Sequence, residues 1–177
     1  PERKKEIQEE TKQREKKRKA EQEEHYKQGA ERASKEWELG APCETHPYLE
    51  KKNVCSYGLR VDKNGSLMIP IENYLGEIAG LQKIDADGNK KIEYGSKKES
   101  NYFFIGKDLL GECDRINYVE GYATGASYFA DHNQPVVVCF DAYNLSNVAK
   151  VFFPFFKTKK HVFIADNDEK SKTGERE

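Results

Sequence analysis

The sequence predicts an α/β fold with three parts: a long charged helix, a smaller and mainly antiparallel subdomain, and a parallel sheet covered by helices. Three observations predict these parts. Residues 1–39 are almost entirely charged or polar, residues 40–113 contain short apolar runs between turn signals, and residues 114–177 alternate apolar strands with helical stretches. The 177 residues are enough for one domain, or two small ones, with a buried core.

Residues 1–39 predict one long helix that is mostly exposed to solvent. Three Glu–Lys pairs have the i, i+4 order that stabilises an exposed helix: Glu15 with Lys19, Glu23 with Lys27, and Glu31 with Lys35. The first half has almost no apolar stripe and therefore no face to bury. Four apolar residues near the end are placed to dock on the rest of the protein: Ala30, Ala33, Trp37 and Leu39. Two interpretations stay open, a solvated connection and an arm that binds nucleic acid or another partner.

Residues 40–113 predict an antiparallel, meander-like region. Its strand-type runs lie at 66–71, 77–84, 90–94 and 101–106. The segments DKNG at 62–65 and DADGN at 85–89 predict hairpin turns, because Gly and Asn adopt positive φ readily. The second turn is similar to a calcium loop, but Lys90 and Ser96 stand where such a loop has Gly and Glu, which excludes that site.

Residues 114–177 predict strands at 116–119, 135–140 and 161–165, each of which runs into a helix or an acidic cluster. Such unalternated apolar strands are typical of a parallel sheet that is covered on both faces. Right-handed crossovers then place the carboxyl ends of all three strands on one edge of the sheet. Ligands bind at that edge in open α/β sheets.

Four carboxylates directly follow these strands: Glu120, Asp141, Asp166 and Asp168. Carboxylates held close together repel one another, and Mg2+ or Mn2+ offsets this repulsion because such cations prefer oxygen ligands. Gly121 lets a phosphate approach Glu120 closely. Asp is an ordinary helix N-cap, so capping and metal binding both stay open for Asp141, whereas Glu is a poor N-cap. We therefore expect a metal site at Glu120, Asp166 and Asp168, and Asp141 stays open as a further ligand.

Composition excludes several classes of function. The net charge of −1 gives no overall attraction to nucleic acid, so local basic residues would have to supply it. No apolar run reaches the roughly 20 residues of a membrane span, and the absence of GxxxxGK[ST] excludes a P-loop ATPase in these residues. The four cysteines lack the spacing of a zinc site, which favours a reduced, cytoplasmic protein. Because the sequence starts at Pro1 and Met68 is its only methionine, we expect a fragment of a longer protein.

Several ordered segments resemble the Toprim primases of plasmids and phages. The run VEGY at 119–122, together with a later strand that ends in FIADND at 163–168, is similar to the Toprim domain shared by primases, topoisomerases and some nucleases. Further segments resemble the plasmid and phage primases in the same order: HPYLEKKNV (46–54), GLRVDKNGSLMIPI (58–71), GEIAGLQKIDADGNKKI (76–92), FFIG (103–106), EGYATGAS (120–127) and CFDAYNLSNVAKVF (139–152). The resemblance covers roughly residues 40–177.

This resemblance implies a primase catalytic core with two parts: an N-terminal subdomain at 40–113 and a Toprim domain at 114–177, truncated at its C-terminal end. The charged helical segment at 1–39 precedes the region that the resemblance covers. It implies that Glu120, Asp166 and Asp168 are catalytic and hold Mg2+ or Mn2+. Residues that it places along the groove for template and nucleotide are Lys91, Lys97, Lys98 and Gly121. The family commonly has further acids after the next strand and an upstream zinc module, and both lie outside this sequence.

The implied reaction is primer synthesis, with single-stranded DNA, nucleoside triphosphates and a replicative helicase as partners. Tyr94, Tyr102 or Phe103 would stack on bases, although core packing is favoured for Phe103. A Toprim nuclease is the first alternative, since the same carboxylates can activate water. A non-catalytic replication module that binds nucleic acid through the charged helix is the second. A topoisomerase is less favoured, because nothing in the sequence marks its Tyr nucleophile.

Overall fold

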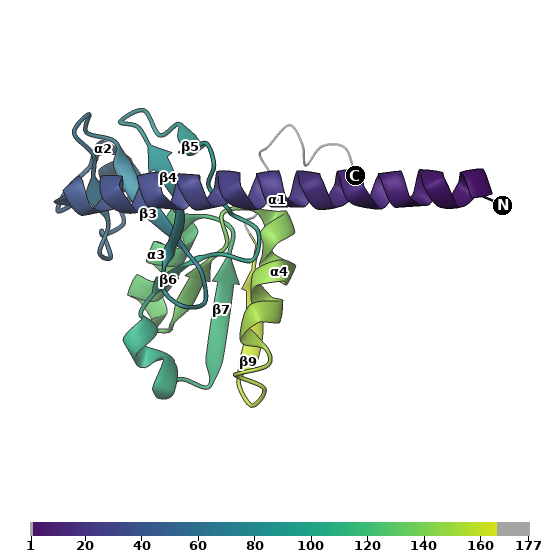
Figure 1. Cartoon of the computed structure of the whole chain (residues 1–177). Helices are drawn as coiled ribbons and strands as arrows, with labels where there is room; N and C mark the ends of the chain where they lie inside the picture. The colour runs from purple at the N-terminus through teal and green to yellow at the C-terminus, as the bar shows by residue number, and fades with distance from the viewer. Residues whose placement is uncertain (1, 166–177) are drawn as a thin grey trace, which may run out of the picture.

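The computed structural model describes residues 2–165 (Figure 1). A long helix, α1 (Glu2–Leu39), lies across an antiparallel sheet, and a second sheet with a helix on each face lies beside the first. Within residues 2–165, no helix combines the length and the apolar character that a bilayer crossing requires.

The first sheet is antiparallel throughout, with the strand order β1-β2-β3-β4-β5. Its strands are β1 (Ala41–Pro42), β2 (Arg60–Val61), β3 (Leu67–Glu72), β4 (Ile78–Ile84) and β5 (Lys90–Ile92). The short helix α2 (Pro47–Lys52) lies between β1 and β2 in the chain. The turns at 62–65 and 85–89 connect β2 to β3 and β4 to β5, which is the antiparallel arrangement that the sequence predicts.

The C-terminal half of α1 docks on this sheet through small and apolar residues. The buried cluster between them contains Ala33, Met68 and Leu81, with Trp37 and Ile78 packed against it. Gly29 approaches Gly95 so closely that a Cβ atom on Gly29 would overlap the Gly95 backbone. The predicted docking of Leu39 is wrong, because this side chain is 88% exposed. Leu39 lies about 200° around the helix from Trp37 and therefore faces away from the sheet.

The second sheet has the order β6-β8-β7-β9. Its strands are β6 (Phe103–Ile105), β7 (Arg115–Val119), β8 (Val136–Val138) and β9 (Lys160–Ile164). β7 is parallel to both β8 and β9, as predicted, and β6 is antiparallel to β8. The sequence predicts β6 as part of the antiparallel subdomain, but the strand pairs with β8 of the second sheet. The bridge between Glu72 and Tyr102, just before β6, joins the two sheets.

Helices cover both faces of the second sheet. α3 (Tyr122–His132) packs on the face that carries Val136 and Val138, and α4 (Ala142–Phe152) packs on the face that carries Val137. A 3-10 helix, η1 (Lys107–Gly111), connects β6 to β7. Because adjacent residues of β8 alternate between two buried faces, the strand is apolar throughout, which is the pattern that the sequence analysis uses to predict it.

Candidate functional site

The three parallel strands end at the same level. Val119, at the end of β7, pairs with Val138 of β8 on one side and with Ile164 of β9 on the other. Because the strands are parallel, the chain leaves all three at one edge of the sheet, where ligands bind in open α/β folds. We call this edge, formed by residues 119–121, 138–141 and 164–165, the carboxyl edge.

Two of the four predicted acids, Glu120 and Asp141, lie in the described part of the carboxyl edge. Asp166 and Asp168 follow β9 in the sequence but lie outside the described residues. Consistent with this, no group of three or more His, Cys, Asp or Glu side chains that could hold a metal is found among residues 2–165. The metal site predicted at Glu120, Asp166 and Asp168 therefore stays a prediction.

Glu120 is the acid whose carboxylate is not used by the fold. It directly follows β7 and is half-buried, and no hydrogen bond or ion pair of its side chain is found within residues 2–165. The N-cap of α3 is the next residue, Gly121, which has no side chain to cap the helix. The Glu120 carboxylate and the first backbone N–H groups of α3 therefore lie together at the carboxyl edge.

Lys90, which was not among the lysines predicted from the sequence, reaches this turn. A Cβ atom built on Gly121 would lie 3.7 Å from Lys90 Nζ, so the missing side chain of Gly121 leaves the ammonium group close to the backbone. Lys90 Nζ is also 5.8 Å from the ring centroid of Tyr48. The predicted residue, Lys91, follows Lys90 in β5. Both lysines are exposed, but successive side chains of a strand point to opposite faces. Two adjacent lysines in a short strand give no signal for which one faces the site.

Tyr122 fixes the start of α3 against the first half of the chain. Its hydroxyl donates to the carbonyl of Cys55 at 2.9 Å and accepts from the backbone N–H of Tyr57 at 2.9 Å. Burial raises the pKa of the Tyr122 phenol, which keeps it protonated and able to donate. The turn that carries Glu120 is thereby tied to the segment that precedes β2.

Asp141 already has two structural partners. It is the N-cap of α4, and its Oδ1 accepts a hydrogen bond from the backbone N–H of Asn144 at 2.8 Å. Its other carboxylate oxygen forms an ion pair with Lys98. The capping interpretation is thus confirmed, and a metal role for Asp141 stays a prediction. Phe140, just before it, has a left-handed backbone with φ of 72°, which turns the chain sharply after β8.

Asn144 holds the segment that carries Lys98 beside the carboxyl edge. Its side chain is buried, and its amide nitrogen donates to the carbonyls of Lys98 at 3.0 Å and Cys139 at 2.9 Å. Its amide oxygen accepts from the backbone N–H of Ser100 at 2.8 Å. One buried amide thus connects the end of β8 to residues 98–100, a link that the spacing of these residues in the sequence does not reveal.

The remaining predicted contacts fall into two groups. Lys97 is exposed, and its Nζ lies 5.8 Å from the ring centroid of Tyr26 in α1. Tyr94 is 78% exposed, so it stays available for base stacking. Tyr102 and Phe103 are only 9% and 7% exposed, so the predicted stacking of Tyr102 is wrong, and the core packing favoured for Phe103 is confirmed. Tyr143, in the first turn of α4, is 91% exposed.

Comparisons with known proteins relate this chain to primases. No family model matches the chain. It is 32% identical over 125 residues to one DNA primase TraC from Escherichia coli and 30% identical over 152 residues to another. These matches cover 69% and 84% of this chain, but only 9% and 14% of the two relatives.

The fold is also similar to that of a solved primase fragment. The crystal structure of the primase fragment of the bacteriophage T7 primase-helicase protein superposes with a TM-score of 0.55 and 18% sequence identity. The match covers 75% of this chain and 59% of that one. At this level of identity the similarity concerns the fold alone, and the TraC matches supply the relationship in sequence. The chain is thus related to the DNA primases, and it matches a short segment of TraC.

Proposed function

We propose that this chain is part of the catalytic core of a plasmid- or phage-type DNA primase, and that its second sheet is a Toprim domain. The carboxyl edge carries the proposal, because Glu120 leaves β7 level with the end of β9, which leads in the sequence to Asp166 and Asp168. The sequence similarity to TraC supports the reaction class. The protein would join ribonucleotides on single-stranded DNA in the cytoplasm, with a replicative helicase as its partner.

In this proposal Glu120, Asp166 and Asp168 hold Mg2+ or Mn2+, with Asp141 beside them. When bound, the ion supplies a Lewis acid that lowers the pKa of the attacking hydroxyl and offsets charge on the triphosphate. The residues fit such an ion, because every predicted ligand is a carboxylate. For Glu120 a ligand role disrupts no hydrogen bond or ion pair seen within residues 2–165.

The side chains around Glu120 suit a triphosphate. Gly121 leaves room for a phosphate beside the first N–H groups of α3, which attract anions. The ammonium group of Lys90 lies next to this space and would bind the same phosphates. Lys98 is oriented by Asp141, and Lys91 and Lys97 are exposed, which suits contacts with the template backbone.

A primer synthesis assay tests the proposal. The chain would be incubated with single-stranded DNA, labelled nucleoside triphosphates and Mg2+ or Mn2+, with Glu120→Gln beside the wild type. Short labelled products that disappear in the variant are expected. Cut template without incorporation would instead indicate a Toprim nuclease. Binding without either product, equal in both proteins, would indicate a non-catalytic module.

A further inference from the structure

The first half of α1 extends beyond the rest of the protein. From Arg3 to Glu24, every side chain that the structure describes is exposed. Contacts with the body begin at His25, whose ring packs against Tyr94 with centroids 4.4 Å apart. Figure 1 shows the helix continuing well past both sheets. We call residues 2–24 the arm.

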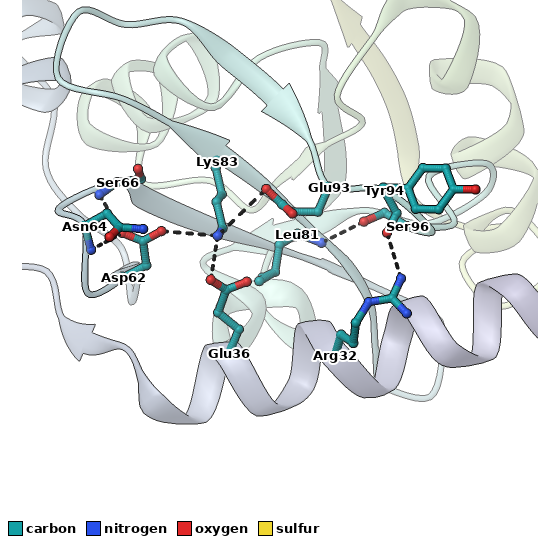
Figure 2. Close-up of polar contacts among 10 residues, drawn as sticks. All are labelled: Arg32, Glu36, Asp62, Asn64, Ser66, Leu81, Lys83, Glu93, Tyr94 and Ser96. Carbon is teal, nitrogen blue, oxygen red and sulfur yellow. Dashed lines mark hydrogen bonds and ion pairs between the residues drawn. The ribbon is translucent and has the colours of Figure 1, made fainter.

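The second half of α1 is held firmly, which fixes the direction of the arm. Lys83 Nζ, from β4, lies 2.5 Å from Glu36 Oε1 and 3.2 Å from Asp62 Oδ2 (Figure 2). Burial alone would lower the pKa of Lys83, but the hydrogen bonds to Glu36 and Asp62 raise it, so the ion pairs persist at neutral pH. Arg32 adds a hydrogen bond to the carbonyl of Tyr94 at 3.2 Å.

The arm starts beside the carboxyl edge. Residues 94–98 run from α1 to that edge: Tyr94 and Lys97 contact α1, and Lys98 forms the ion pair with Asp141. His25 and Tyr26 of α1 contact this segment, and the arm ends at Glu24, directly before them in the chain. A nucleic acid strand that leaves the carboxyl edge on this side therefore meets the arm next.

The arm carries a concentrated positive charge near its middle. Residues 12–19, KQREKKRK, contain six basic side chains and one acid, and we call them the basic segment. Two of the six are paired within the helix: Arg14 with Glu10 at 3.8 Å, and Lys17 with Glu21 at 3.9 Å. Lys12, Lys16 and Lys19 have helical spacing that places them on one face, and no ion pair of theirs is found within residues 2–165.

We propose that the basic segment binds the phosphates of the single-stranded DNA template as the strand passes the carboxyl edge. Residues 12–19 lie about 10 to 21 Å along the helix from Tyr26, at 1.5 Å per residue. At ~3.4 Å per nucleotide of a stacked strand, this is about three to six nucleotides of template. The proposal rests on the primase function proposed above, since it is that function which supplies a template.

Charge complementarity favours nucleic acid over the other possible occupants. A second copy of the helix would need apolar residues along one face, and Ile7 and Ala20 are the only apolar residues in the arm. A membrane surface would require an apolar face opposite the basic one, which this composition also lacks. Phosphates need only exposed cations at spacings that a flexible strand can follow.

Binding of the 177-residue chain to a labelled 20-nucleotide single strand, without metal or nucleotide, tests the proposal. The variant Lys12→Gln/Lys16→Gln/Lys19→Gln removes the unpaired face of the basic segment. The matched control, Lys35→Gln/Lys51→Gln/Lys52→Gln, removes the same charge from exposed lysines outside the arm. Affinities are measured across a range of salt concentrations, and circular dichroism verifies that each variant keeps its helix content.

The arm variant is expected to lower the salt slope by about two, since each phosphate contact of a single strand contributes ~0.7. This corresponds to roughly 100-fold weaker binding at 0.1 M salt, whereas the control variant changes the slope little. Equal slopes for the arm variant and the wild type would overturn the proposal, as would tighter binding of duplex DNA or self-association through the arm. This assay measures DNA binding alone. A loss of binding by the arm can therefore be distinguished from a loss of primer synthesis in the assay described above.

Discussion

Two turns lead from the second sheet into a helix, and they use their acids in opposite ways. After β7, Glu120 precedes a glycine N-cap, and its carboxylate has no partner within residues 2–165. After β8, Asp141 is itself the N-cap, and both of its oxygens are engaged, one by the Asn144 N–H and one by Lys98. The comparison shows that an acid at a strand end is available for chemistry when another residue occupies the cap position.

Replacement of Glu120 gives the largest expected effect. Glu120→Gln is expected to lower primer synthesis at least ~1,000-fold, since the proposed metal ligand is lost while the side-chain shape is kept. The free energy of unfolding, measured with urea, should change by less than ~0.5 kcal/mol. Glu112→Gln, which removes an exposed acid beyond η1, is the control. A Glu120→Gln protein with normal activity would remove the basis for the metal site.

Replacement of Lys90, the lysine near the Glu120 turn, gives the second-largest expected effect. Lys90→Gln is expected to reduce kcat/KM for nucleotide by about 10- to 100-fold, because a charge-assisted hydrogen bond contributes ~1.5–3 kcal/mol. Lys91→Gln, the neighbouring exposed lysine, should have a smaller effect, since its side chain points to the other face of β5. Equal losses in the two variants would contradict the assignment of Lys90 to the Glu120 turn.

Asp62 contrasts most clearly with Glu120, because both of its carboxylate oxygens have partners within the fold. Burial alone would raise its pKa, but hydrogen bonds from the Ser66 and Asn64 N–H groups and from Lys83 lower it below the usual 3.8. The stabilisation is therefore present above pH 3.8 and is lost as the pH falls through the lowered pKa. In urea titrations between pH 2 and pH 7, the acid loss of stability should be smaller in Asp62→Asn. An unchanged acid dependence in that variant would show that other groups cause it.

Replacement of Asp141 gives the smallest expected change in stability. Two variants separate its role as a helix cap from a role as a metal ligand. Asp141→Ala should lower the free energy of unfolding by about 1 kcal/mol, because the α4 cap is lost. Asp141→Ser keeps a capping oxygen and should restore most of this stability. If primer synthesis by Asp141→Ser falls as far as that by Glu120→Gln, Asp141 is also a metal ligand. Activity close to the wild type would leave it as a cap and a partner of Lys98.

Local patterns in the sequence predicted much of the second sheet. The apolar runs before Glu120 and Asp141 gave the parallel strands, since strands buried on both faces show no alternation. Residue type also indicated the cap of α4, which was one of the two interpretations left open for Asp141. These features depend on neighbours in the chain, which is why the sequence shows them.

Pairing and packing between segments that lie far apart in the chain could not be predicted in the same way. The run that forms β6 pairs with β8 rather than with the first sheet, and nothing within the run itself indicates that partner. The burial of Tyr102 likewise depends on packing against Phe152, 50 positions later in the chain. Side chains alternate between the two faces of β5, so the register of this three-residue strand decides whether Lys90 or Lys91 reaches Gly121. A shift of one residue would exchange the two lysines.

The two hydrogen bonds of the Tyr122 hydroxyl have a consequence for the energetics of the nucleotide binding proposed above. Lys90 comes from the first sheet and Glu120 from the second, so their separation depends on how the two halves are joined. Tyr122 joins them through Cys55 and Tyr57 before any nucleotide arrives. In the proposed function the site is therefore preorganised: the entropy cost of bringing cation and carboxylate together is met during folding, and less of the binding free energy is lost to ordering the protein.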